Sequence, residues 1–184
     1  MTDLGAIADR LEIIEVCTRV HWCYDHQDWD GLDFLFADTV SMPTLAQAGS
    51  AGFDLDQYLD GYLFSREELK RALSSVRAGL ITQHLIAGHQ VTVEGDAAVC
   101  LAHSVNIHMA SGAAGSGAAG SGAAGSGAAG SGRGLVAHGN DYRFDLLRTA
   151  DGWRIRGWVP RIRWEYGDEA SYDADARQAA WRQG

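Results

Sequence analysis

The sequence is poor in cysteine, in basic charge and in long apolar runs, and each shortage excludes a class of protein. Three cysteines without paired spacing, Cys17, Cys23 and Cys100, argue against a disulfide framework or a zinc site. Lysine and arginine number 15 against 24 aspartates and glutamates, and the resulting net charge of −9 disfavours binding to nucleic acid. No stretch approaches the roughly 18 apolar residues of a membrane span. The first ten residues lack the apolar segment of a secretory signal, so we expect a reducing, cytoplasmic setting.

The length of 184 residues predicts one domain over 1–184, and 46% apolar residues suffice for a core. Residues 111–132 stand apart as a five-residue repeat that holds 9 of the 23 glycines. The repeat has no charged, aromatic or branched side chain, so we expect a flexible loop inside the domain. A natural repeat expansion and an engineered replacement would give this same pattern. Residues from about 168 to 184 are expected to form a C-terminal tail.

Helical patterns dominate the first half of the chain. A stripe with steps of three and four residues predicts a long first helix, and its members are Ile7, Leu11, Ile14, Thr18, His21 and Asp25. Asp28 is a suitable N-cap for a second, short helix that reaches Phe36. Ser65 and Glu68 have the spacing of a capping box for a third helix, which Gly79 would end.

Strand patterns dominate the second half. Mixed signals between Met42 and Phe64 predict a loop with a helical piece around Leu55 to Leu63. Two hairpins follow, each with a turn dipeptide, Gly95-Asp96 or Asp151-Gly152. The expected strands are 80–87, 90–94, 97–109, 135–148 and 153–164. Helices followed by an antiparallel sheet indicate the α+β class, with the helices on one face of a curved sheet and a pocket between the layers.

Asp25 and the histidines are the candidates for chemistry. Asp25 lies on the apolar stripe of the first helix, where a carboxylate is costly to bury without a partner; alternatively, it caps the next element. The chain has seven histidines, and His84 lies near the start of a strand. His103 and His108 lie at an odd separation on one strand, so only one of them can face the pocket. An aspartate that fixes the tautomer of a histidine would make that histidine a base.

The spacing of the histidines does not favour a metal site. Neither the H-x-H nor the HExxH pattern is present, and we expect no metal ligands.

Several segments together resemble scytalone dehydratase and its SnoaL-like relatives in the NTF2-like superfamily. These segments are YDHQDWDGLDFLF, TQHLIAG, DGWRIRGWVPRIRW and WEYGD. The resemblance covers about Ile7 to Asp168 apart from the repeat. It implies an NTF2-like cone, an α+β fold whose N-terminal helices pack on a curved, mainly antiparallel sheet that encloses a pocket.

The resemblance also implies site residues. The family's catalytic aspartate and histidine match Asp25 and His84, and the tyrosine beside the aspartate matches Tyr24. The family's second histidine matches His108 when the gap is placed in the hairpin turn, and His103 when it lies elsewhere. A second family tyrosine aligns near Thr44 and is missing, and Asn140 or Asp141 stands near the family's serine and asparagine. These departures affect the substrate more than the acid–base chemistry.

These matches lead to a functional hypothesis. We expect a cofactor-independent dehydratase that eliminates water from a hydroxy-ketone or polyketide-like molecule, with His84 as base, His108 as acid and Tyr24 polarising the carbonyl. The expected substrate-binding residues, each of which could equally be ordinary core, are Trp22, Phe53, Val105, Asn140 and Trp158. The resemblance also implies a homo-oligomer, because members of this family commonly form trimers or dimers. The alternatives are a non-catalytic binding or accessory protein and a dehydrohalogenase, cyclase or isomerase that uses the same dyad.

Overall fold

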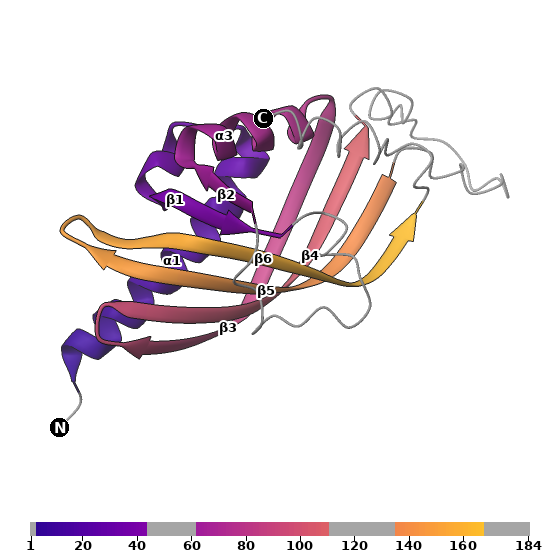
Figure 1. Cartoon of the computed structure of the whole chain (residues 1–184). Coiled ribbons are helices and arrows are strands. Elements are labelled where there is room, and N and C mark those ends of the chain that lie inside the picture. The colour runs from indigo at the N-terminus through magenta and orange to yellow at the C-terminus, as the bar shows by residue number, and fades with distance from the viewer. Residues whose placement is uncertain (1–2, 44–61, 111–134, 168–184) are drawn as a thin grey trace, which may run out of the picture.

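The computed structural model describes residues 3–43, 62–110 and 135–167, which form two α-helices, a short 3-10 helix at Gly31–Phe34 and one sheet (Figure 1). The α-helices are α1 (Leu4–His26) and α3 (Arg66–Arg77). The strands are β1 (Phe36–Met42), β2 (Tyr62–Ser65), β3 (Leu80–Glu94), β4 (Ala97–Ala110), β5 (Leu135–Thr149) and β6 (Gly152–Gly167). Their order across the sheet is β2-β1-β6-β5-β4-β3. Only the β1–β6 pair is parallel among these strands, so the predicted α+β class with a mainly antiparallel sheet is confirmed.

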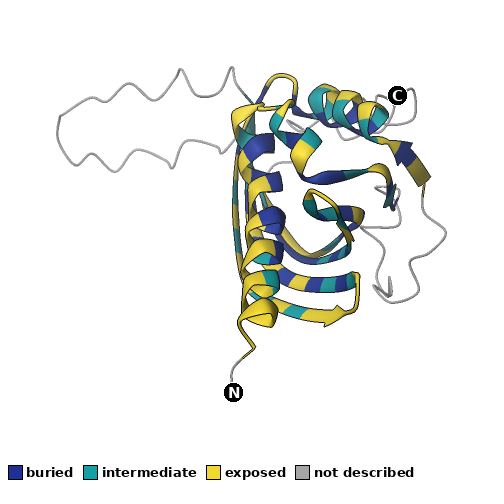
Figure 2. Cartoon of the chain, turned by 90° about the vertical axis from the view of Figure 1, so that its left-hand side faces the viewer, coloured by how far each residue is buried: buried dark blue, intermediate teal, exposed yellow. Residues whose placement is uncertain are grey.

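Helix α1 lies across one face of the sheet and contributes a stripe to the core. The N-cap residue of α1 is Asp3, whose carboxylate accepts hydrogen bonds from the backbone N–H groups of Gly5 and Ala6. The face turned toward the sheet is buried and the opposite face is exposed (Figure 2). Its buried side chains pack with apolar residues of β5 and β6, among them Phe144, Leu146 and Trp153. The last turn of α1 lies against the start of β3, the strand at one edge of the sheet.

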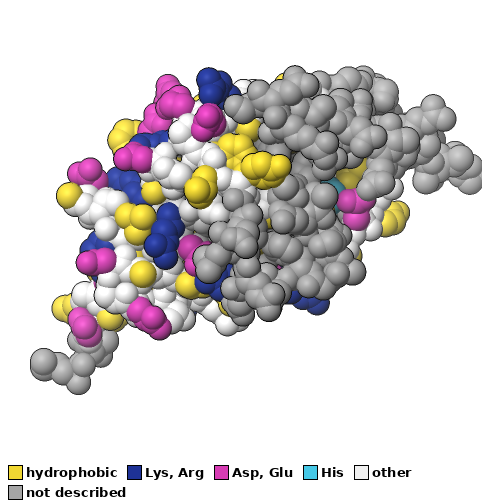
Figure 3. Space-filling view, in the orientation of Figure 1, with side chains coloured by type: hydrophobic (Ala, Val, Ile, Leu, Met, Phe, Trp, Pro, Cys, Tyr) yellow, Lys and Arg dark blue, Asp and Glu magenta, His cyan; other side chains and the backbone are white. Residues whose placement is uncertain are grey.

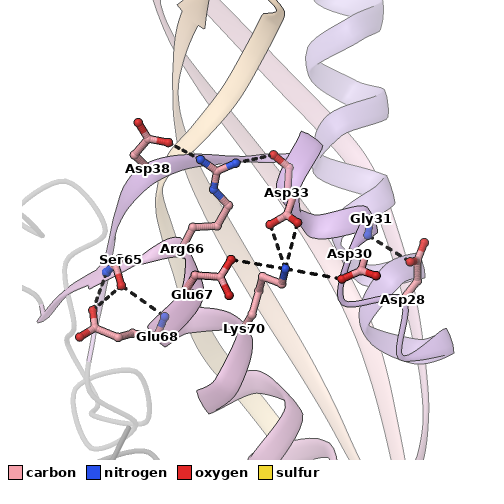
Figure 4. A network of polar contacts seen from close by, with 10 residues as sticks. All are labelled: Asp28, Asp30, Gly31, Asp33, Asp38, Ser65, Arg66, Glu67, Glu68 and Lys70. Atoms are coloured by element: carbon pink, nitrogen blue, oxygen red, sulfur yellow. Dashed lines mark hydrogen bonds and ion pairs between the residues drawn. The ribbon is translucent and has the colours of Figure 1, made fainter.

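Helix α3 is tied to the segment that follows α1 by ion pairs (Figure 4). Lys70 Nζ lies 3.0 Å from Asp33 Oδ1, and Arg66 donates to the Asp33 carbonyl oxygen and to Asp38. The predicted capping box is present, because Ser65 Oγ accepts from Glu68 N while the Glu68 carboxylate accepts from Ser65 N. The network joins the N-terminal half of α3 to the 3-10 turn and to β1.

Replacing Ser65 with alanine is expected to lower the free energy of unfolding by about 1 kcal/mol, because the first turn of α3 loses its cap. Urea unfolding followed by circular dichroism measures the change. Ser75→Ala, within the same helix and away from the cap, is the control. Equal stability of Ser65→Ala and the wild type would contradict a contribution from the cap.

The two predicted hairpins are present. β3 and β4 pair through the Gly95-Asp96 turn, and β5 and β6 pair through the Asp151-Gly152 turn. The expected strands 80–87 and 90–94 form one strand, β3, with a register shift between Ala87 and Gln90. Gly88 accommodates this bulge with a φ of 70°. β4 and β5 are neighbours in the sheet, while the repeat and the C-terminal tail lie outside the described residues.

Two expectations about the first half are wrong. The predicted second helix does not reach Phe36, which begins β1; only one 3-10 turn forms, and Asp28 Oδ1 accepts from its first N–H group, that of Gly31. Tyr62 and Leu63, expected in a helical piece, begin β2 instead. Pairing between β1 and β2 supplies backbone hydrogen bonds that local propensity does not reveal. The rest of that piece lies outside the described residues.

The surface of the described part mixes charges of both signs. Lysine and arginine side chains are interspersed with aspartate and glutamate over the face seen in Figure 3. The described helices include none with the length and apolar character that a membrane crossing requires.

Candidate active site

The last turn of α1 points the carboxylate of Asp25 at the start of β3. Asp25 Oδ1 lies 2.6 Å from His84 Nδ1 and accepts from Thr82 Oγ1 at 2.7 Å. Asp25 Oδ2 accepts from the backbone N–H of His84 at 2.7 Å. Thr82 and His84 can both reach it because residues two apart on a strand lie on one face. The predicted neighbours Asp25 and His84 are thus brought together, and Thr82, which the sequence analysis missed, joins them.

The environment keeps Asp25 ionised. Burial raises the pKa of this carboxyl, but the hydrogen bond and charge of His84, together with the bonds from Thr82 and the His84 N–H, outweigh it and lower the pKa to about 2. A carboxylate at Nδ1 holds a proton on that nitrogen and leaves the lone pair on Nε2. His84 is therefore oriented as a base through Nε2, and its side chain is only 6% exposed.

Arg77, at the end of α3, secures the turn that carries Asp25. The buried Arg77 side chain donates from Nη2 to the carbonyl oxygen of Asp25 at 3.1 Å. This contact involves the main chain of Asp25 and leaves its carboxylate to His84. A cation at a helix C-terminus also complements the helix dipole.

His108 lies beside His84 on the face of the sheet that α1 covers. His108 Nε2 is 3.4 Å from His84 Nε2, and the residues Thr82 and His108 are paired across β3 and β4. His103, at an odd separation, lies on the opposite face, where its side chain is 70% exposed and its Nδ1 is 2.8 Å from Asp141 Oδ1. The two histidines thus point to opposite faces, and His108 is the one near the dyad.

Tyr24 lies next to the dyad from the helix side. Its ring stands at 90° to the His84 ring, with 5.3 Å between centroids, and the residue is 7% exposed. Asp25 and Tyr24 are adjacent in sequence, so both approach His84 from the last turn of α1.

Deeper on the same face, the expected residue Asn140 forms a polar cluster with Tyr142 and Asn106, which the sequence analysis did not identify. Tyr142 Oη accepts from Asn106 Nδ2 at 2.9 Å and from Asn140 Nδ2 at 3.4 Å. Burial raises the pKa of the Tyr142 hydroxyl, so it stays neutral. The ring of the fully buried His21 contacts Tyr142 at 4.8 Å between centroids, and burial, followed by the charge of His84, lowers the pKa of His21 to about 3. His21 is thus a neutral imidazole.

The structure brings two of the five expected substrate-binding residues to this face. Asn140 is buried beside Tyr142, and Trp158 is buried with its ring 5.7 Å from that of His21. Trp22 is 64% exposed and stacks on His26, while Val105 is 38% exposed on the face of β4 that carries His103. Neither residue lies near the dyad, because Trp22 is on the exposed face of α1 and Val105 is on the exposed face of β4. Phe53 lies outside the described residues.

Within the three described ranges, no group of three or more His, Cys, Asp or Glu side chains is arranged to hold a metal ion. An open groove of about 950 Å³ lies elsewhere on the molecule, along β1 and the ends of β5 and β6. Its lining includes Phe34, Thr39 and Arg154 but neither member of the dyad.

Comparison with known proteins shows similarity in sequence and in fold. The family model of the SnoaL-like domain matches residues 5–159. No curated protein matches the chain. The Kfla4162 protein of Kribbella flavida is 22% identical, with a TM-score of 0.69 over 94% of this chain and 99% of the other. A protein of Novosphingobium aromaticivorans provisionally described as a scytalone dehydratase is 14% identical, with a TM-score of 0.61 over 91% and 92%. A provisional dehydratase of the NTF2-like family from Streptomyces avermitilis is 16% identical, with a TM-score of 0.56 over 85% and 97%.

Proposed function

The chain belongs to the family of SnoaL-like domains, and from this premise we propose that it is a cofactor-independent dehydratase, a lyase that eliminates water from a hydroxy-ketone or polyketide-like small molecule. The observation that carries the proposal is the position of His84, whose ring lies between the carboxylate of Asp25 and the imidazole of His108. Two of the similar structures are provisionally described as dehydratases, which agrees with this chemistry.

The first step is removal of a proton. Asp25 holds Nδ1–H of His84, so the Nε2 lone pair takes the proton from the carbon next to the substrate carbonyl. The electron pair of that C–H bond moves toward the carbonyl and forms an enolate. Asp25 stabilises the resulting imidazolium, and Tyr24 polarises the carbonyl oxygen directly or through a water.

The second step is loss of the hydroxyl. His108 donates a proton to the departing hydroxyl, the C–O bond breaks, and the electron pair returns to form the carbon–carbon double bond. The proton taken by His84 balances the one given by His108, so the products are an unsaturated ketone and water. Each positioned acid or base contributes roughly 10²–10⁴-fold.

The leaving group tests the proposed role of His108. Hydroxide needs a proton to leave and halide does not, so His108→Gln is expected to slow water elimination by about 10²-fold and halide elimination by much less. The assay follows the unsaturated product by ultraviolet absorbance, with β-hydroxy ketones and the corresponding β-chloro ketones as substrates. His103→Gln, on the same strand but the other face, is the control.

The outcome separates the candidate activities. Halide release without water release by the wild type would replace the dehydratase with a dehydrohalogenase, which the same dyad serves. Binding of these ketones without turnover of either series would favour a ligand-binding protein. A homo-oligomer, trimeric or dimeric, remains part of the proposal, and the mass in solution tests it.

A further inference from the structure

A third histidine extends the row of rings away from Asp25. His138 lies on β5, and its ring centroid is 5.3 Å from that of His108. The Nδ1 of His138 is 2.9 Å from Glu165 Oε2, a carboxylate on the neighbouring strand β6. The rings of His84 and His108 have the same separation of 5.3 Å. The row therefore runs from Asp25 through His84, His108 and His138 to Glu165.

The two ends of the row differ in their access to water. The side chain of Asp25 is 12% exposed and that of His138 is 10% exposed, whereas the side chain of Glu165 is 29% exposed. Protons can therefore enter or leave the row at Glu165 more readily than at the Asp25 end.

The proposed elimination needs an uneven distribution of protons. His84 must be neutral to act as base, while His108 must be protonated to act as acid. Asp25 alone would attract the extra proton to His84, which is the wrong ring. A second carboxylate at the far end of the row counteracts this attraction, because an opposite charge stabilises the protonated form of nearby rings.

We infer that the Glu165–His138 pair is a second carboxylate–imidazole dyad that holds His108 in its protonated form and connects it to solvent. This inference rests on the proposed function. The negative charge of Glu165, 2.9 Å from His138 Nδ1, favours a proton on His138 and on the adjacent ring of His108. His138 and Glu165 are positioning residues, since they act on the substrate through His108.

Other charged and titratable groups also bear on His108. Among the described residues they are His84 from β3, His138 from β5, Asp25 and Tyr24 from α1 and, through His138, Glu165 from β6. His21 adds no charge, because its lowered pKa keeps it neutral. The single change that removes charge from the far end alone is Glu165→Gln.

A substrate-free test is the titration of the three rings by ¹⁵N NMR in the wild type, Glu165→Gln and the control Glu94→Gln. Glu165→Gln is expected to lower the proton affinity of His138 about tenfold and to lower the pKa of His108 in parallel. Glu94→Gln, an exposed carboxylate at the end of β3, should leave all three titrations unchanged. An unchanged His138, or a shifted His138 with an unchanged His108, would overturn the inference.

A kinetic test adds a readout that a merely structural role would not move. Glu165→Gln should lower kcat several-fold for β-hydroxy ketones at neutral pH with little change in KM, and Glu165→Asp, which keeps the carboxylate, should retain more of the activity. Equal losses in the two variants with an unchanged pH profile would contradict the relay. If no ketone is turned over by the wild type, the proposed function fails, while the NMR result still decides whether the second dyad acts on His108.

Discussion

Replacing His84 with glutamine is expected to lower kcat/KM for β-hydroxy ketones by about 10³-fold, because the substrate loses its base. Glutamine keeps the length and polarity of the side chain and has no lone pair of comparable basicity. It can still donate to Asp25, so the fold around the dyad should survive. Steady-state kinetics with the ultraviolet assay measures the loss.

The control for this variant is His103→Gln, which removes an imidazole from the exposed face of β4. That variant should retain wild-type kcat/KM. A His84→Gln protein that is folded by circular dichroism and retains more than a tenth of the activity would exclude His84 as the base.

Replacing Asp25 with asparagine is expected to lower kcat by about 10²–10⁴-fold, although the side chain keeps its shape. The amide oxygen can take the place of Oδ2 and accept from the backbone N–H of His84, but the NH₂ group then takes the place of Oδ1 and faces Thr82 Oγ1 and His84 Nδ1. His84 would accept at Nδ1 and carry its proton on Nε2, which cannot then act as a base. A matched variant is Asp151→Asn in the β5–β6 turn, for which no loss of activity is expected.

The same variant should change how stability depends on pH. Asp25 has a pKa near 2 in the folded protein against 3.8 as its ordinary value, so its contribution to stability is complete above about pH 4 and is lost as the pH falls toward 2. With allowance for solvent screening, the contribution is about 1–2 kcal/mol. Urea unfolding at pH 6 and pH 3 should show a smaller decrease for Asp25→Asn than for the wild type. Equal decreases would contradict the lowered pKa.

Local patterns were sufficient to predict the long helix, the third helix and both hairpins. Each of these predictions rests on residues that are close together in the sequence. The signals are the helical spacing from Ile7 to Asp25, the Ser65 capping box and the two glycine-containing turns. The pairing of β1 with β2 and β6 was beyond such reasoning. Phe36 begins a strand because Ile155 N donates to Leu35 O and β6 lies alongside, contacts between residues more than 100 positions apart.

The site was predicted in part for a similar reason. A costly carboxylate on an apolar stripe and the resemblance to a known family indicated Asp25, His84 and His108. Thr82 was missed, although its position two residues before His84 places it on the same face of β3.

The residues of β5 offered an equally clear signal that was not used. His138, Asn140 and Tyr142 alternate along one strand, so they had to share a face. Which face they share depends on the register of β5 against β4, and no local pattern in the sequence fixes that register. Glu165 was inaccessible to sequence reasoning, since its contact with His138 follows from the pairing of β5 with β6.

The central claim is that His84, oriented by Asp25, removes a proton from the carbon beside a carbonyl. The most direct measurement uses a saturated ketone without the departing hydroxyl, incubated with the protein in D₂O and followed by proton NMR. Wild type and His108→Gln should both place deuterium on that carbon, and His84→Gln should not. Deuterium incorporation by His84→Gln at the wild-type rate would contradict the account.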